Sequence, residues 1–142
     1  MQRSAIPSSL KSKGTYILFL FLEKDQCIRI GRLGRIHFRR GYYMYVGSAM
    51  NGLYGRLKRY LNGVKKRHWH IDYLIEVARL RAVLVIPSDV RLEEYVAWRL
   101  SQVFESIRGF GSTDSKLTSH LFYVGQSVKN SKTILSKGNL VS

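Results

Sequence analysis

The chain has 142 residues, 45% of them hydrophobic, which is enough for one domain with a substantial buried core. Its longest apolar run, YILFLFL, has the length of a strand and falls short of the roughly 20 residues of a membrane-spanning helix, so no membrane association is expected. The single cysteine, Cys27, excludes an internal disulfide and a cysteine-built zinc site, and 24 Lys and Arg residues against nine Asp and Glu residues give a net charge of +15. We expect a buried, unreactive thiol at Cys27 and a cytoplasmic or nucleoid-associated protein.

The first 47 residues predict strands that are joined by short turns. Residues 1–13 are polar and are expected to form a flexible N-terminal segment. Residues 14–23, GTYILFLFLE, predict a buried strand, and residues 26–34 predict a second strand after a polar turn. Two more short strands are expected at 35–38 and 41–47. Four consecutive strands with such short connections predict an antiparallel meander.

Helical spacing begins after the turn SAMNG. Residues 53–61 repeat apolar side chains every three or four positions, which predicts a helix. A basic loop at 62–69 separates it from a second expected helix, HIDYLIEVARL, at 70–80. The run RAVLVIP at 81–87 predicts a strand that ends at its proline.

The last third of the domain predicts one longer helix and one strand. The helix spans about 90–107, with one apolar face and with Ser88 or Asp89 as its N-cap. A Gly/Ser-rich loop at 108–119 leads to a final strand at 120–125. No repeat or second domain is visible, and the segment from residue 126 to the end reads as a polar tail.

The positive charge is concentrated in one part of the sequence. Between Asp25 and Asp72 there is no acidic residue. The same stretch contains eleven basic residues: Arg29, Arg32, Arg35, Arg39, Arg40, Arg56, Lys58, Arg59, Lys65, Lys66 and Arg67. A polyanion such as nucleic acid is the natural partner for this charge, and the alternatives are a solubility surface or an acidic membrane.

The few acidic residues limit where a divalent cation could bind, because such an ion needs at least one carboxylate. Glu93 and Glu94 open the predicted long helix, where acidic side chains commonly complement the helix dipole. Glu93 borders the apolar stripe of that helix, through Ala97, whereas Glu94 shares a face with Trp98. Spacing alone favours the dipole interpretation and leaves a metal ligand as the alternative.

Three of the four histidines lie near other polar residues. His68, His70 and Asp72 form an H-x-H-x-D pattern that resembles a set of metal ligands on a strand. A helix beginning near His70 would instead scatter the three side chains around its axis, so structural or phosphate-contacting roles are favoured. His120, at the start of the final strand, is likewise expected to be structural.

Two tyrosines in predicted strands allow two interpretations. Tyr16 and Tyr45 are good strand formers, and most strand tyrosines have no further role. A phenol beside an arginine and a metal-bound water can also relay a proton in phosphodiester cleavage. Residue types and spacing do not decide between the two.

The order of these motifs resembles the GIY-YIG nuclease superfamily. The matching parts are GTY at 14–16, YVG at 45–47, Arg56 in the following helix and a glutamate on a later helix. Three further stretches, HWHIDYL, GFGSTDS and SHLFYV, resemble one branch of it, often known only as a domain of unknown function and sometimes fused to DNA-repair glycosylases. The resemblance covers about residues 12–125.

The resemblance implies a fold and an activity. The fold is α+β, a small central antiparallel β-sheet flanked by helices, here at residues 14–125 and followed by the polar tail at 126–142. The activity is metal-dependent hydrolysis of phosphodiester bonds in DNA, with one Mg²⁺ or Mn²⁺ as cofactor. The alternative is a non-catalytic nucleic-acid-binding domain that retains this fold.

It also implies roles for four residues. Tyr16 and Tyr45 would lie side by side and face the scissile phosphate, and Tyr16 would help to deprotonate the attacking water. Arg56 would contact the phosphate and stabilise developing charge. Glu93 would hold the metal ion, with Glu94 as the fallback.

The chain departs from the usual pattern at several positions. Thr15 replaces an aliphatic residue in the first motif, and the 29 positions between Tyr16 and Tyr45 indicate an inserted pair of strands. The asparagine that often completes the site has no evident counterpart, although Ser112 or Asp114 would stand near it. We assign DNA contacts to basic residues outside the catalytic set: Arg40, Lys58, Arg59, Lys65, Lys66, Arg67 and His70.

Overall fold

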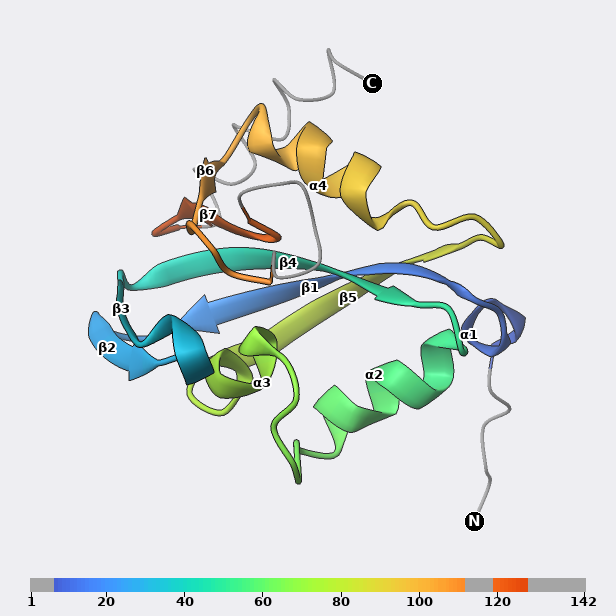
Figure 1. The fold of residues 1–142 in the computed structure, drawn as a ribbon, viewed down its shortest axis with the longest axis horizontal. Coiled ribbons are helices and arrows are strands. Elements are labelled where there is room, and N and C mark those ends of the chain that lie inside the picture. Colours follow the sequence, from blue (N-terminus) through green and yellow to red (C-terminus); the bar gives the residue numbers. More distant parts are fainter. Residues whose placement is uncertain (1–6, 112–118, 128–142) are drawn as a thin grey trace.

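The two long apolar segments of the first 49 residues pair with each other along their whole length. In the computed structural model, which describes residues 7–111 and 119–127, β1 (Gly14–Leu22) and β4 (Gly41–Ala49) are antiparallel partners. β5 (Arg79–Pro87) lies on the other side of β1, and β7 (Leu121–Gly125) and then β6 (Glu105–Ser106) extend the sheet beyond β4. The resulting order is β5-β1-β4-β7-β6 (Figure 1). The predicted α+β class with a central antiparallel sheet is confirmed.

The expected meander is wrong, because the second and third strands leave the sheet. β2 (Gln26–Arg29) and β3 (Arg35–Phe38) pair only with each other, and the short 3₁₀ helix η1 (Gly31–Leu33) connects them. Each has only four residues, which cannot match the nine of β1, whereas β4 can. The extra strand pair that was expected between the two tyrosine motifs is present as this hairpin.

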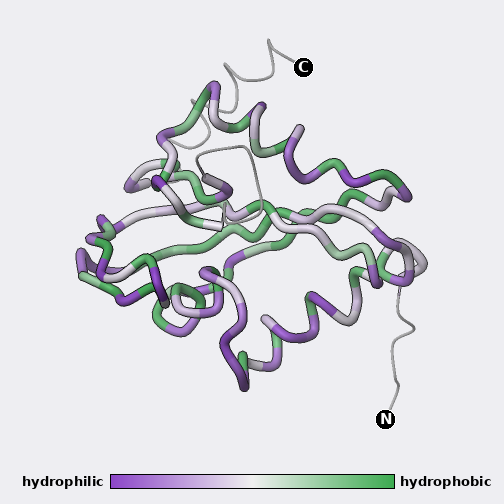
Figure 2. Tube along the Cα trace, viewed as in Figure 1, coloured by the Kyte–Doolittle hydropathy of each residue, from purple (hydrophilic) through white to green (hydrophobic). Residues whose placement is uncertain are grey.

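Helices cover both faces of the sheet. Strand residues alternate between the faces, and both faces of β1 are buried, so its sequence is apolar almost throughout. One face packs against α2 (Leu53–Leu61), α3 (His70–Ile75) and the β2–β3 hairpin, and the other packs against α4 (Glu93–Ser101). Figure 2 shows apolar residues along the central strands and hydrophilic residues on the loop between α2 and α3.

Two predicted helices are shorter in the structure because the sheet takes their ends. Strand pairing with β1 begins at Arg79, so α3 ends before the predicted residue 80. Glu105 pairs with Tyr123 of β7, so α4 cannot continue to residue 107. The predicted cap is also wrong: the Ser88 hydroxyl hydrogen-bonds Val90 within a turn, and α4 begins later without a side-chain cap.

The N-terminal region and the cysteine differ from expectation. Residues Ser8–Lys11 form the short helix α1, which the sequence did not predict. Cys27 is exposed, because the alternation of β2 gives the buried side to Ile28. In residues 7–111 and 119–127, no helix is long and apolar enough to cross a membrane.

Candidate active site

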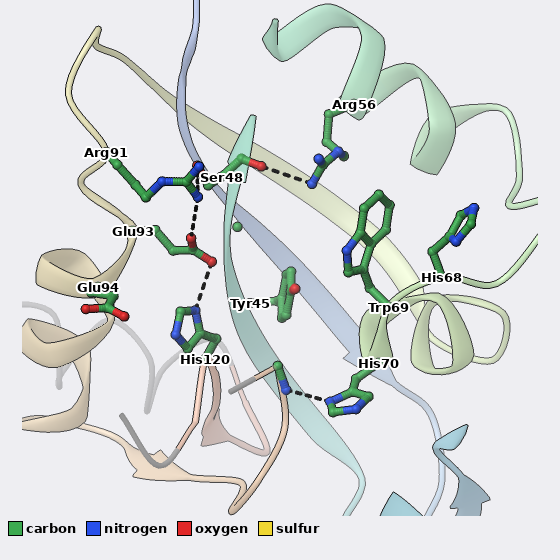
Figure 3. Close-up of a pocket in the computed structure, with 12 residues that line it drawn as sticks. Tyr45, Ser48, Arg56, His68, Trp69, His70, Arg91, Glu93, Glu94 and His120 are labelled. Carbon is green, nitrogen blue, oxygen red and sulfur yellow. Dashed lines mark hydrogen bonds and ion pairs between the residues drawn. The ribbon is translucent and has the colours of Figure 1, made fainter. Parts of the chain in front are cut away.

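A polar cavity of about 660 Å³ opens where β4 runs beyond its partner strand (Figure 3). β7 begins opposite Tyr45, so the last residues of β4 have no strand neighbour on that side among the described residues. The residues around the opening come from β4, α2, α3 and the loop before it, α4 and the loop before it, and the segment before β7. They are Tyr45, Gly47, Ser48, Arg56, His68, Trp69, His70, Arg91, Glu93, Glu94, Gly111 and His120.

Tyr45 faces this cavity from the sheet, whereas Tyr16 does not reach it. The two tyrosines lie on adjacent strands, but Tyr16 is paired with Gly47 and is fully buried. Its hydroxyl shares a hydrogen bond of 2.8 Å with the hydroxyl of Tyr60 on α2. Burial raises the pKa of both strand tyrosines above the ordinary value, so both are neutral phenols at pH 7.

The glycine of YVG makes room for the Tyr16 ring. A Cβ atom added to Gly47 would lie 2.3 Å from both Cζ and Oη of Tyr16. No side chain can share that space with the ring, so the two motifs interlock across β1 and β4.

Arg56 is directed to the cavity by the amphipathic pattern of α2. Leu53, Leu57 and Tyr60 face the sheet, which leaves Arg56 at the edge of that buried stripe. Its guanidinium donates a 2.9 Å hydrogen bond to the carbonyl of Ser48 and lies 4.2 Å from the centre of the Trp69 ring. The arginine is therefore held in place before any ligand binds.

Glu93 approaches from the opposite side. It is the first residue of α4, its side chain is 20% exposed, and its Oε2 lies 3.2 Å from Nδ1 of the buried His120. Its Oε1 lies 3.6 Å from the guanidinium of Arg91, which also donates to the Ser48 hydroxyl at 3.4 Å. Figure 3 shows the Glu93 carboxylate directed toward His120, whereas Glu94 points away from this group.

Comparison with known families places the whole domain in one of them. A model described as "Domain of unknown function DUF123" matches residues 15–140. The chain belongs to the DUF123 family. A search of curated proteins and a search of solved structures found no match.

The H-x-H-x-D motif of this DUF123 protein is structural at its aspartate. Asp72 is fully buried, and its carboxylate accepts hydrogen bonds from the backbone N–H groups of His68 and Trp69. It also forms an ion pair with Arg59 of α2. Among the described residues of the domain, no three His, Cys, Asp or Glu side chains gather as a metal site.

Two predicted DNA contacts are committed to other partners within the DUF123 fold. Arg59 pairs with the buried Asp72 and also donates to the carbonyl of Lys66. Arg67 makes a bidentate pair with Glu76, which raises the pKa of the arginine and lowers that of the glutamate through their hydrogen bonds. Both side chains therefore stabilise the loop between α2 and α3 and its junction with α3.

His70 is likewise engaged. Its Nδ1 accepts a 2.8 Å hydrogen bond from the backbone N–H of Gly111, and burial lowers its pKa. A neutral ring suits this acceptor role, so His70 joins α3 to the segment before the final strand.

The remaining predicted contacts fall into two groups. Lys58, Lys65 and Lys66 are exposed on α2 and on the loop that carries Trp69 to the cavity. Arg40 precedes the start of β4, roughly 23 Å of strand away from Gly47 at about 3.3 Å per residue. The structure therefore does not bring Arg40 to the cavity.

Sequence reasoning missed several residues that meet here. Ser48 and Arg91 had no assigned role, and His120 was expected to be structural. The expected stand-ins for the missing asparagine, Ser112 and Asp114, lie outside the described residues. The one usable signal for His120 was its place directly before an apolar strand, but only the pairing of β7 with β4 brings it to Glu93.

Proposed function

We propose that this DUF123 domain is a metal-dependent endonuclease of the GIY-YIG type that hydrolyses phosphodiester bonds in DNA. The observation that carries the proposal is the meeting of three groups from three elements at one cavity. These are the Arg56 guanidinium of α2, the Tyr45 phenol of β4 and the Glu93 carboxylate of α4. A fixed cation and a hydroxyl donor can stabilise the charge that develops on a phosphodiester, and a carboxylate can hold a metal ion that activates water.

Arg56 is the phosphate-binding group of the proposed reaction. Its position is fixed by the Ser48 carbonyl and by the Trp69 ring, so little reorganisation is needed when negative charge develops. Tyr16 helps to hold Arg56 in position, since the Tyr16 hydroxyl hydrogen-bonds Tyr60 and lies beside Arg56. We therefore reassign Tyr16 from the base that deprotonates water to a residue that positions Arg56.

Tyr45 is better suited to donate a hydrogen bond than to accept a proton. Burial raises its pKa well above the ordinary value, so the phenol keeps its proton at neutral pH. Its hydroxyl can donate to a phosphate oxygen in the cavity and share the developing charge with Arg56.

Glu93 is the residue that would hold the metal ion. A Mg²⁺ ion usually retains several waters and binds through one or two carboxylates and the substrate phosphates, so one carboxylate facing a polar cavity fits it. When bound, such an ion supplies a Lewis acid and lowers the pKa of a bound water.

Exposed lysines on α2 and on the loop that leads to Trp69 support nucleic acid as the substrate class. Lys58, Lys65 and Lys66 lie on α2 and the following loop, and the net charge of the chain is +15. Such a surface tracks phosphates without reading bases, which agrees with a nuclease that responds to DNA structure more than to sequence.

A cleavage assay tests the proposal. Duplex, nicked, branched and single-stranded DNA and RNA are incubated with Mg²⁺, with Mn²⁺ and with EDTA. Arg56→Ala and Glu93→Gln should each reduce metal-dependent DNA cleavage by about 10²–10³-fold, with the fold and DNA affinity measured alongside. The matched control is Glu94→Gln, which changes an exposed neighbour on the same helix turn and should cleave normally.

The outcomes separate the proposal from its rival. DNA binding by a wild-type protein that never cleaves would favour the non-catalytic binding domain. Loss of cleavage in Glu94→Gln but not in Glu93→Gln would show that Glu94, and not Glu93, holds the metal ion.

A further inference from the structure

His120 is a buried histidine whose ring has no hydrogen-bonding partner among the residues that the structure describes. The residue is 1% exposed, and its backbone is fixed by bonds from its N–H to the Phe110 carbonyl and from the Val46 N–H to its own carbonyl. Within the described residues, neither ring nitrogen forms a hydrogen bond. Buried polar atoms nearly always have a hydrogen-bonding partner. His120 lines the cavity, so its unpartnered ring indicates that a ligand binds there.

A carboxylate oxygen of Glu93 lies close to the His120 ring without forming a hydrogen bond to it. Nδ1 of His120 lies 3.2 Å from Oε2 of Glu93. Two donor atoms that each lie about 2.1 Å from one metal ion are about 3.0 Å apart at a right angle and about 3.4 Å apart at a tetrahedral angle. The observed separation falls between these values.

We propose that His120 is a second protein ligand, and that Nδ1 of His120 and Oε2 of Glu93 bind the same divalent ion. This rests on the proposed function for the purpose of the ion and goes beyond it in the ligand set. Imidazole favours ions later in the first-row series, whereas Mg²⁺ prefers oxygen ligands. The site therefore binds Mn²⁺ more tightly than Mg²⁺.

The surroundings leave room for this ion. Arg91 lies near the other carboxylate oxygen, Oε1, and is itself largely exposed, so water screens its charge. The remaining coordination positions face the cavity, where water and a phosphate oxygen can reach them.

Pulsed electron paramagnetic resonance of the full chain with Mn²⁺ tests the inference without relying on cleavage. The wild type should show coupling of Mn²⁺ to one ¹⁴N nucleus, and this coupling should change to the ¹⁵N pattern in protein made with ¹⁵N-histidine. His120→Asn should abolish the coupling and weaken Mn²⁺ binding by at least about 10-fold, since even outer partners of metal ligands cost 10–100-fold. The matched control is His68→Asn, an exposed histidine of the same cavity, which should retain both.

Three results would overturn the inference. Mn²⁺ that binds in a Glu93-dependent way without nitrogen coupling would leave the nuclease proposal intact and remove His120 from the ligand set. Coupling that survives in His120→Asn would assign the nitrogen to another residue. Wild-type protein that binds Mg²⁺ as tightly as Mn²⁺ would contradict a site with a nitrogen and an oxygen ligand. The ¹⁵N measurement uses wild-type protein, so it tests the inference even if His120→Asn does not fold.

Discussion

Replacing Gly47 with alanine should destabilise the fold through Tyr16. The new Cβ would lie 2.3 Å from Cζ and Oη of the Tyr16 ring and 2.7 Å from Cε1. The ring has nowhere to go, because it is fully buried and its strand is paired with β4 on one side and β5 on the other. Either the ring must rotate away from Tyr60 or the strands must separate.

The loss of stability can be estimated from the overpacking and from the loss of the hydrogen bond between Tyr16 and Tyr60. Overpacking a buried site costs about 1–3 kcal/mol, and loss of the hydrogen bond between the two tyrosine hydroxyls costs about 1 kcal/mol more. The free energy of unfolding should therefore fall by about 2–4 kcal/mol. For a domain of this size, that is a decrease of roughly 10 °C in Tm.

Thermal and urea unfolding measure this effect, and two further variants control for it. Gly55→Ala, in α2 with no atom near the new Cβ, should leave stability unchanged or raise it by up to about 1 kcal/mol. In a Tyr16→Leu background the ring is absent, so Gly47→Ala should cost less than about 1 kcal/mol. Wild-type stability of the single variant Gly47→Ala would refute the pairing of Tyr16 with Gly47.

Three other changes test the loop, α3 and the basic surface. Asp72→Asn should lower the free energy of unfolding, measured in urea, by about 3 kcal/mol or more, because it breaks the ion pair of the buried carboxylate with Arg59 on α2. A smaller loss would mean that the pair is not buried. Burial lowers the pKa of His70, so the unfolded chain binds the proton more readily than the folded one, and Tm should fall as pH drops below about 6.5. His70→Asn keeps an acceptor for the Gly111 N–H and should reduce this fall in Tm. An equal fall in both proteins would contradict this prediction. Lys65→Ala combined with Lys66→Ala should weaken DNA binding equally for all sequences and reduce the slope of log K against log salt by about 2 in fluorescence anisotropy, and a change in sequence preference would argue against backbone contacts.

The sequence predicted those parts of the fold that depend on neighbouring residues. The apolar run of β1 and the three- and four-residue spacing of α2 both appear within nine positions, and both elements are confirmed. Arg56 was assigned to the site from the family resemblance, and the structure agrees with its position at the cavity, because the buried stripe of α2 leaves it at the edge.

The misses that most affect the sheet and the site concern pairing between distant residues. Strand β1 pairs with β4 and not with β2, which follows it in the sequence, and the register of this pairing packs the Tyr16 ring against Gly47. The partner of Arg59 lies 13 residues away on another helix, and the 27-residue gap between Glu93 and His120 closes only when β7 joins the sheet. Residue types and local periodicity contain no information about such choices, since several registers satisfy the same apolar pattern.

Ser48 connects the end of a strand to the two arginines at the cavity. Because β7 starts opposite Tyr45, Ser48 has no strand partner on that side of β4 among the described residues, and its carbonyl binds a side chain instead. The carbonyl accepts from Arg56 on α2, and the hydroxyl accepts from Arg91 before α4. A free arginine side chain loses up to about 2 kcal/mol of rotamer entropy when it is immobilised, and here much of that loss occurs on folding. Two guanidinium groups on opposite sides of one residue, of which Arg56 is the more firmly held, suit an anion with several oxygens, which is the form of the phosphodiester in the proposed reaction.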